Sequence, residues 1–201
     1  TGGSGHLGKA ISKEILNSGG KIIFLTKNKN KILQMKFFKK FKKQITIYEC
    51  DLMNSRSLRN SLQEISKKLK FLNGIVNIAA YIKLGDIDNQ TDKDLRDSFQ
   101  VNVLSVFQII KEMKNLLKRG SAIKKENSSV VNISSIYGMV APDYSVYKKP
   151  QFVNSISYGC SKASLIHLSK YLATSKEFQN IRVNSVTPGA FPNINSNFKK
   201  Q

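Results

Sequence analysis

TGGSGHLGKAISKEILNSGGKIIFLT, residues 1–26, is a glycine-rich turn followed by a helical pattern and then by a short apolar run. Glycines in residues 1–8 allow a tight turn and a close approach of the backbone to a pyrophosphate, and the helix that follows offers N–H groups to phosphate oxygens. The run Lys21–Thr26 has the length and composition of a buried strand. These parts in this order favour a dinucleotide-binding unit over an ordinary flexible turn.

The rest of the chain continues the same alternation of strands and helices. Strands are expected at Lys21–Thr26, Ile45–Cys50, Gly74–Ile78, Ser129–Ile133 and Ile181–Val186, and helices at about 7–17, 29–42, 55–69, 91–118 and 157–176. This alternation predicts an α/β fold, a Rossmann-like doubly wound parallel sheet with helices on both faces in three layers.

The pattern lacks one strand. A phosphate-binding glycine turn ordinarily follows a strand, whereas this one starts at residue 1, and the chain stops shortly after Pro188-Gly189. We therefore expect residues 1–201 to form a single dinucleotide-binding domain of the Rossmann type that lacks its first strand and is truncated at both ends.

The composition limits the class of protein. The chain has 201 residues, enough for one domain with a full core, and 40% of them are hydrophobic. No apolar run approaches the roughly 20 residues that cross a bilayer, and no secretory signal is visible. Two cysteines, Cys50 and Cys160, make no disulfide framework. A reducing cytoplasm is the expected location.

The net charge of +20 makes a nucleic acid or an anionic membrane worth considering as a partner. Only five of the 33 basic residues are Arg, whose planar guanidinium favours bases and phosphates. The densest basic cluster, residues 27–43, carries Ile32, Phe37 and Phe38 within it and is typical of an amphipathic helix with a solvated lysine face. We therefore expect no nucleic acid and no membrane partner. A basic protein that binds nucleic acid or a membrane surface stays as an alternative.

Tyr158 and Lys162 are four residues apart in a helical pattern, which places both side chains on one face, one turn apart. An ammonium there favours the phenolate and lowers the tyrosine pKa from its ordinary value of about 10, so that the tyrosine can act as a general acid or base. Tyr144 and Lys148 have the same spacing, but prolines bracket them. The alternative for Tyr158 and Lys162 is a half-buried tyrosine beside a solvated lysine.

With these residues identified, the chain resembles the short-chain dehydrogenase/reductase family nearly end to end. The segments that carry the resemblance are the turn 1–8, Asp51-Leu52, Asn77-Ile78-Ala79-Ala80, Asn102 in VNVLSVF, Ser135 at the end of VNISS, Tyr158-Gly-Cys-Ser-Lys162 and Pro188-Gly189. The resemblance implies an NAD(P)-dependent oxidoreductase that transfers hydride between nicotinamide and an alcohol or carbonyl.

The resemblance also implies residue roles. Tyr158 would exchange a proton with the substrate oxygen, and Lys162 would hold it near ionisation and bind the nicotinamide ribose. Ser135 would bind the same oxygen, and Asn102 would fix a relay water. The positions that match cofactor-binding residues are Gly2, Gly5, His6, Leu7, Gly8, Lys27, Asp51, Leu52, Asn77, Ala79, Tyr158, Lys162, Pro188 and Gly189. The two histidines lack partners at metal-ligand spacing, so no metal is expected.

The chain departs from the family in three places. The glycines are spaced as in the extended, sugar-nucleotide branch, Ile78 and Ala80 replace usual residues, and 22 residues separate Ser135 from Tyr158, where about a dozen are common. At the end of the second strand of the family, Lys27 stands where NAD enzymes carry an acidic residue. Lys27 favours a 2′-phosphate and therefore NADP, with NAD as the other candidate. The alternative is that Lys27 is an ordinary solvated lysine with no role in cofactor choice.

The longer insert, residues 137–150, is expected on the substrate side, where its tyrosines and lysines suit a sugar that carries phosphate or carboxylate. It resembles members linked to surface-sugar and flagellin modification, and the alternative is a variable solvated loop. In the family, helices matching 91–118 and 157–176 pack into a dimer or tetramer, so a homo-oligomer is expected. The alternative function is a non-catalytic dinucleotide-binding or regulatory module.

Overall fold

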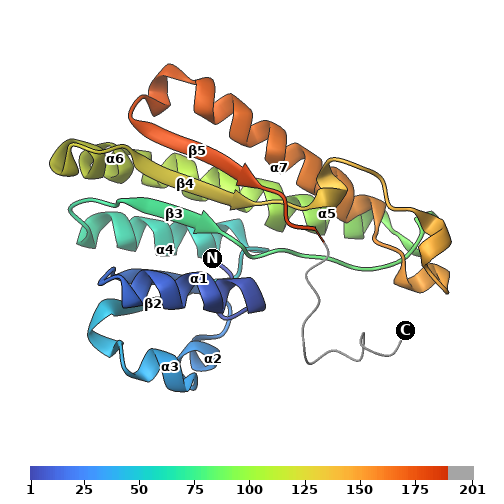
Figure 1. Cartoon of the computed structure of the whole chain (residues 1–201), viewed down its shortest axis with the longest axis horizontal. Coiled ribbons are helices and arrows are strands. Elements are labelled where there is room, and N and C mark those ends of the chain that lie inside the picture. The colour runs from blue at the N-terminus through green and yellow to red at the C-terminus, as the bar shows by residue number, and fades with distance from the viewer. Residues whose placement is uncertain (190–201) are drawn as a thin grey trace.

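The computed structural model describes residues 1–189 and has the expected α/β architecture (Figure 1). Its strands are β1 (Ile22–Thr26), β2 (Ile45–Glu49), β3 (Gly74–Asn77), β4 (Ser128–Ile133) and β5 (Ile181–Val186). Its helices are α1 (His6–Asn17), α2 (Lys29–Leu33), α3 (Lys36–Lys39), α4 (Ser55–Lys68), α5 (Asp92–Phe99), α6 (Ser105–Lys124) and α7 (Ile156–Thr174). Each expected strand is present, because each is a short apolar run that two layers of helices can bury.

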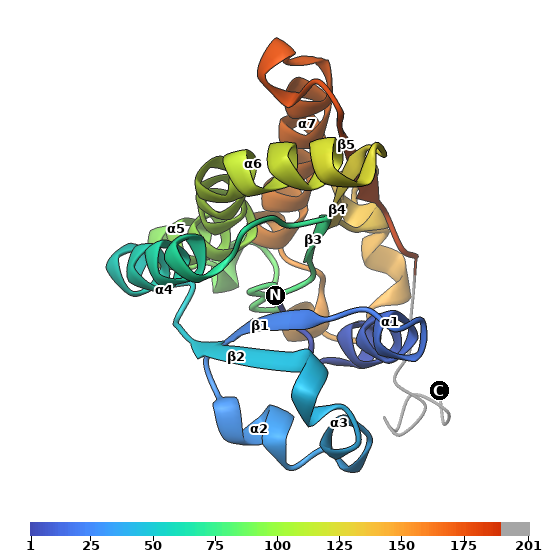
Figure 2. The same ribbon diagram turned by 90° about the vertical axis from the view of Figure 1, so that its left-hand side faces the viewer.

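Alternate residues of β1 face opposite layers, as the period of two in a strand requires. Phe24 packs with Leu16 of α1 and with Phe38 of α3. Leu25 packs instead with residues of α4 and α6. Figure 2 accordingly shows α4 and α6 to one side of the strands and α1 to the other. The three-layer α/β/α arrangement is therefore confirmed.

The described strands form two parallel sheets where the sequence predicts one. β1 pairs with β2, and β3, β4 and β5 pair in that order. Within residues 1–189 no strand lies between β1 and β3, and a cavity of about 930 Å³ separates them. Ile23, Leu25 and Ile75 are among its lining residues. We call this cavity the β1–β3 slot.

Thr1 lies at the edge of the slot. Its amine donates a hydrogen bond to the carbonyl oxygen of Val76 in β3 at 2.9 Å. Thr1 therefore makes one hydrogen bond to β3 of the kind that joins neighbouring strands. It does so at the position where the sequence predicts the missing strand to end.

Two helix predictions differ from the structure. The expected helix 29–42 is wrong as one element, because Met35 has extended backbone (φ −71°, ψ 116°) that separates α2 from α3. This break lets Ile32 and Phe38 both bury against the layer of α1. The expected helix 91–118 is α5 and α6 joined by a π-helical turn, Gln100–Leu104, and it continues to Lys124. The hydroxyl of Ser105, the first residue of α6, donates to the carbonyl of Val101 in that turn at 2.6 Å.

The insert 137–150 contains no α-helix. Tyr144 lies in a short 3-10 turn, Tyr144–Val146, and its side chain is 54% exposed. The Tyr144–Lys148 pair therefore does not lie on one helix face, in agreement with the prolines that bracket it. Among residues 1–189 no helix is long and apolar enough to cross a membrane.

Candidate active site

Ser135 and Tyr158 meet where the end of β4 packs against the start of α7. The Ser155 hydroxyl caps α7 by accepting from the Tyr158 N–H at 3.4 Å, which places Tyr158 in the first turn. The turn after Ser135 packs on α7 so closely that a Cβ on Gly138 would lie 2.8 Å from the Lys162 carbonyl carbon. The Ser135 side chain therefore lies close enough to the Tyr158 phenol to lower the pKa of that phenol. The structure thus brings together two residues that are 23 positions apart.

Lys162 is buried beneath this pair. Its side chain is 2% exposed, and its ammonium donates to the carbonyl oxygen of Ile133 at 2.7 Å. The same ammonium lies 5.6 Å from the centre of the Tyr158 ring, within cation–π range. Burial lowers the pKa of Lys162 to about 8. The expectation of a lysine beside the tyrosine is met, and the lysine is buried rather than solvated.

The pKa of Tyr158 is raised above its ordinary value, which is the opposite of the direction predicted from the four-residue spacing. Burial of the phenol is the larger cause, and the hydrogen bond from Ser135 opposes it. The ammonium of Lys162 lies beside the ring and donates its hydrogen bond to the Ile133 carbonyl rather than to the phenol oxygen. Its charge therefore does not outweigh the cost of burying a phenolate. Spacing along a helix predicts proximity but not the balance between charge and burial.

Asn102 lies in the π-helical turn and is fully buried. Its Oδ1 accepts from the Tyr81 N–H at 2.8 Å, and its Nδ2 donates to the Tyr81 carbonyl at 3.0 Å. This two-point contact fixes the backbone that leaves β3. The side-chain amide also donates to the hydroxyls of Ser98 and Ser161. Its hydrogen-bonding capacity is therefore used within the protein, and the expected relay water stays a prediction.

The glycine-rich turn is fastened to the end of β3. The Thr1 hydroxyl accepts from the N–H groups of Ile78 and Ala79 at 3.1 and 3.2 Å. Gly2 has a φ of 67°, and a Cβ there would lie 2.6 Å from the Ala79 nitrogen, so no other residue fits. The predicted cofactor positions Gly2 and Ala79 are thus in contact. Thr1 was not among the predicted site residues, although it opens the turn.

The turn fits a pyrophosphate. Gly5 caps α1 without a side-chain hydrogen bond, so the first turn, which begins with His6, Leu7 and Gly8, presents its backbone to an anion without a competing cap. The first turn of α1 contains no acidic residue that would repel phosphate. The residues present therefore fit the dinucleotide that the sequence predicts.

Lys27 and Asp51 form an ion pair of 2.8 Å at the ends of β1 and β2. Lys27 is 77% exposed, and its hydrogen bond is the main cause that lowers the pKa of Asp51. The sequence predicts both residues for the adenosine end of the cofactor but gives no sign of the pair. Leu52 follows, and its carbonyl accepts from Gln100 at 3.2 Å.

The remaining predicted residues lie at the same edge. Asn77 ends β3, and its amide donates to Asn132 of β4 at 2.9 Å in the buried interior. The carbonyl of Pro188 accepts from the Ile136 N–H at 3.0 Å, which holds Pro188 and Gly189 next to the turn that follows Ser135. All predicted site residues therefore lie at the carboxyl ends of the strands or on helices that start there.

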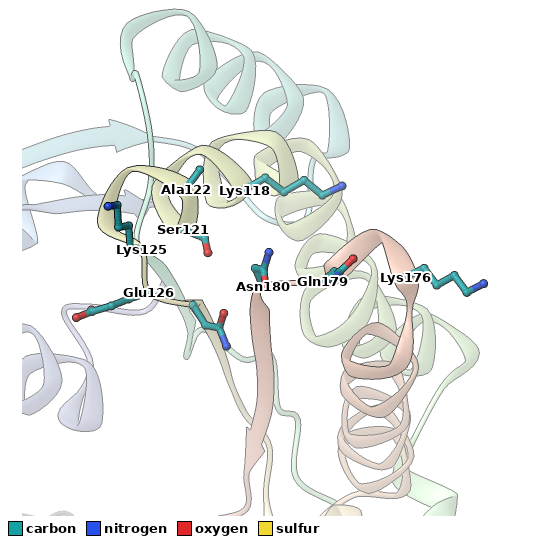
Figure 3. Close-up of a pocket in the computed structure, with 9 residues that line it drawn as sticks. Lys118, Ser121, Ala122, Lys125, Glu126, Lys176, Gln179 and Asn180 are labelled. Atoms are coloured by element: carbon teal, nitrogen blue, oxygen red, sulfur yellow. The ribbon is translucent and has the colours of Figure 1, made fainter.

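A second hollow, of about 690 Å³, lies at the opposite edge, by the amino ends of β4 and β5 (Figure 3). Figure 3 shows Ser121 and Asn180 facing the hollow, while the ammonium ends of Lys118 and Lys176 point away from it. This hollow is separate from the candidate active site.

Comparison with known proteins agrees with this geometry. A family model described as "short chain dehydrogenase" matches residues 1–197. The post-translational flagellin modification protein A of Campylobacter coli is 26% identical over 195 residues, which are 94% of this chain and 74% of that protein. The NADH-dependent L-xylulose reductase of Ambrosiozyma monospora is 29% identical over 201 residues, 94% of this chain and 70% of that protein.

Solved structures show the same fold. The Pseudomonas aeruginosa RhlG/NADP active-site complex has a TM-score of 0.80 at 25% identity, over 95% of this chain and 71% of that chain. The match to the family model covers nearly the whole sequence and includes the turn, Asn102, Ser135, Tyr158 and Lys162. This chain belongs to the short-chain dehydrogenase family and has the Rossmann fold of an oxidoreductase.

Proposed function

We propose that the chain transfers hydride between a nicotinamide dinucleotide and the alcohol or carbonyl group of a small molecule, with Tyr158 as the proton donor and acceptor. The observation that carries this proposal is the Ser135 side chain beside the Tyr158 phenol, with buried Lys162 5.6 Å from the centre of the Tyr158 ring. These groups are arranged to bind one oxygen atom and to move one proton to or from it.

The cofactor, when bound, supplies or accepts the hydride. The protein residues do the rest. In the reductive direction the Tyr158 hydroxyl gives its proton to the carbonyl oxygen, and Ser135 donates a hydrogen bond that stabilises charge on that oxygen. In the oxidative direction the same groups act in reverse, and Tyr158 takes the proton from the alcohol.

In the reductive direction Tyr158 starts from the protonation state that its surroundings favour. Burial raises the pKa of this phenol, so its neutral, proton-bearing form predominates at neutral pH. A neutral phenol is ready to donate, whereas oxidation needs a phenolate first. The favoured assay therefore starts from a carbonyl compound and a reduced dinucleotide.

NADP is the preferred cofactor in this proposal, with NAD as the alternative. Lys27 stands at the end of β1 with its ammonium exposed, in position to meet a 2′-phosphate, although Asp51 now pairs with it. The relatives divide, because one is solved with NADP and another is named for NADH. The ratio of NADPH to NADH affinity, measured by fluorescence titration, tests the preference.

The proposed substrate is a sugar or sugar derivative, of the class that carries phosphate or carboxylate. One relative is named for the post-translational modification of flagellin and another for the reduction of L-xylulose, a sugar. The insert adds exposed Tyr144, Val146, Lys148 and Lys149, and its Tyr147 hydroxyl lies 2.8 Å from the hydroxyl of Tyr137 in the turn after Ser135. Aromatic faces suit sugar rings, and ammonium groups suit anionic substituents.

A homo-oligomer through α6 and α7 completes the proposal. Leu104, at the end of the π-helical turn, and Phe107, in the first turn of α6, are 52% and 44% exposed, and Tyr171 on α7 is 69% exposed. Large apolar side chains on adjoining helices favour burial against a second copy. Sedimentation velocity tests this part. Cys50 and Cys160 are both unpaired, which fits the reducing cytoplasm proposed as the location.

The test of the function is an assay of NADPH oxidation with a panel of keto sugars, sugar phosphates and nucleotide sugars. Turnover of one class, dependent on carbonyl concentration, supports the oxidoreductase. Tight binding of the dinucleotide without turnover of any carbonyl would favour the non-catalytic module. Salt-dependent binding to DNA, without dinucleotide binding, would favour the basic surface-binding protein.

A further inference from the structure

The start of α7 is tied to the end of α5 by two buried serines. Ser98 of α5 and Ser161 of α7 are both 0% exposed, and their hydroxyl oxygens are 3.1 Å apart. Both also contact Asn102, whose Nδ2 lies 3.1 Å from Ser98 and 2.9 Å from Ser161. None of the functional predictions from the sequence uses either serine.

The hydroxyls of this cluster reach the backbone of α7. Ser98 donates to the Ser157 carbonyl at 3.0 Å and Ser161 donates to the Tyr158 carbonyl at 2.8 Å, while either hydroxyl can be the donor in the contact between the two serines. Neither hydroxyl has a second proton, so both act as acceptors toward Asn102. The network therefore has one direction, from the Asn102 amide through the serines to the α7 backbone.

The amide of Asn102 has two hydrogens. One is donated to the Tyr81 carbonyl, and the two serine oxygens share the other. The Asn102 Oδ1 accepts from the Tyr81 N–H. Asn102 thus joins three backbones, namely the segment after β3, the π-helical turn and the first turns of α7.

We propose that Ser98 and Ser161 are positioning residues that hold the backbone of Tyr158 at a fixed place relative to Asn102 and to Ser135. This inference rests on the proposed function of Tyr158. The two serines bond to each other, to Asn102 and to backbone carbonyls rather than to the phenol. They act on backbone carbonyls in the first turns of α7, and through them on the reach of the Tyr158 hydroxyl toward Ser135.

The geometry makes the consequence specific. The Ser135 side chain beside the phenol lowers the pKa of Tyr158 against the larger effect of burial. A shift of the α7 start weakens this influence of Ser135, because interactions between hydroxyls depend steeply on distance and angle. Loss of either serine hydroxyl is therefore expected to raise the pKa of Tyr158 further and to slow proton transfer.

The chain offers a matched control in Ser169. This serine lies on the same helix, is 2% exposed, donates to the Leu165 carbonyl at 2.8 Å and accepts from Asn132 at 2.9 Å. It has the same chemistry as Ser161 but lies two turns further along and does not contact Asn102. Its replacement measures the cost of losing a buried serine hydroxyl in α7 without the proposed positioning effect.

The experiment compares Ser161→Ala, Ser98→Ala and Ser169→Ala with the unchanged protein. Tyrosine labelled with ¹³C at Cζ reports phenol ionisation by NMR, and the Tyr158 signal is assigned with Tyr158→Phe. The expected result is a higher pKa of Tyr158 in both Ser161→Ala and Ser98→Ala and no change in Ser169→Ala. We also expect kcat to fall about tenfold in Ser161→Ala, with KM for the dinucleotide within about twofold.

Equal pKa values of Tyr158 in Ser161→Ala and Ser169→Ala would overturn the inference, even if both variants melt at lower temperature. Should Ser161→Ala fail to fold, Ser98→Ala decides in the same way. The NMR measurement needs no turnover, so the outcomes are separable. A pKa shift in a protein that reduces no carbonyl would contradict the proposed function and leave the positioning role standing.

Discussion

The ammonium of Lys162 donates to the carbonyl oxygen of Ile133 at 2.7 Å, deep beside the end of β4. Burial is the cause that lowers the pKa of this ammonium. This contact ties the lysine of α7 to the strand that carries Ser135. Because this ammonium is buried in the folded state, its protonation affects the free energy of unfolding, which can be measured.

The first prediction concerns stability at alkaline pH. The pKa of Lys162 is lowered from 10.5 to about 8, so between these values the folded state binds fewer protons than the unfolded state. The free energy of unfolding that depends on Lys162 therefore rises with pH across this interval and is lowest below about pH 8. Relative to Lys162→Met, the unchanged protein is expected to gain up to about 3 kcal/mol over this range.

Urea titrations of both proteins at several pH values check this prediction. The comparison of the two cancels the contributions of tyrosines and other lysines that titrate in the same range. A difference in free energy of unfolding that stays constant from neutral to alkaline pH would show that Lys162 is not held as a buried cation.

The second prediction concerns cofactor choice at the Lys27–Asp51 pair. Lys27→Ala is expected to weaken NADPH binding about threefold, because an exposed ammonium contributes only a few tenths of a kcal/mol to about 1 kcal/mol. NADH affinity is expected to stay the same. Asp51→Asn has the opposite effect on NADPH, since it removes a carboxylate and releases Lys27.

Fluorescence titration of the two reduced dinucleotides with each variant measures these changes. The two variants serve as controls for each other, because they alter the same ion pair from its two sides. If Lys27→Ala lowers the affinity for NADPH and for NADH equally, Lys27 does not distinguish a 2′-phosphate from a 2′-hydroxyl.

The third prediction concerns the β1–β3 slot. The edges of β1 and β3 face one cavity of about 930 Å³, and Thr1 already bonds to Val76 at its rim. A Val/Ile-rich segment of about five residues joined ahead of Thr1 fits this space as a parallel strand. Each buried Val or Ile is worth about 1.5–3 kcal/mol, so the free energy of unfolding is expected to rise by at least about 3 kcal/mol.

The matched control is a Gly/Ser segment of the same length, which has no side chains to bury. Chemical denaturation of the two extended proteins and the original chain gives the answer. If the two extensions stabilise the chain equally, the slot does not take a strand.

The sequence predicts those parts of the protein that depend on local pattern. Apolar runs locate the strands, and the four-residue spacing places Tyr158 beside Lys162. The break at Met35 was missed because it depends on which phenylalanines α1 can bury. The sequence does not predict the π-helical turn, because the turn carries Asn102, whose hydrogen bond to Tyr81 is a tertiary contact that no local pattern reports.

The electrostatic details of the site depend on tertiary structure in the same way. Lys27 and Asp51 are 24 positions apart, and only the pairing of β1 with β2 brings them to 2.8 Å. The pKa of Tyr158 moves against the expectation because burial, which no local pattern reports, exceeds the influence of Lys162.

The most direct test of the account is the turnover of Tyr158→Phe, which removes one oxygen atom and keeps the ring. Tyr144→Phe is the matched control, since Tyr144 has a lysine at the same spacing but lies in an exposed 3-10 turn. With the carbonyl substrate found in the panel, we expect Tyr158→Phe to lose at least about 1000-fold in kcat while dinucleotide affinity stays within about twofold, and Tyr144→Phe to keep its rate. A Tyr158→Phe protein that turns over at the original rate would contradict the account.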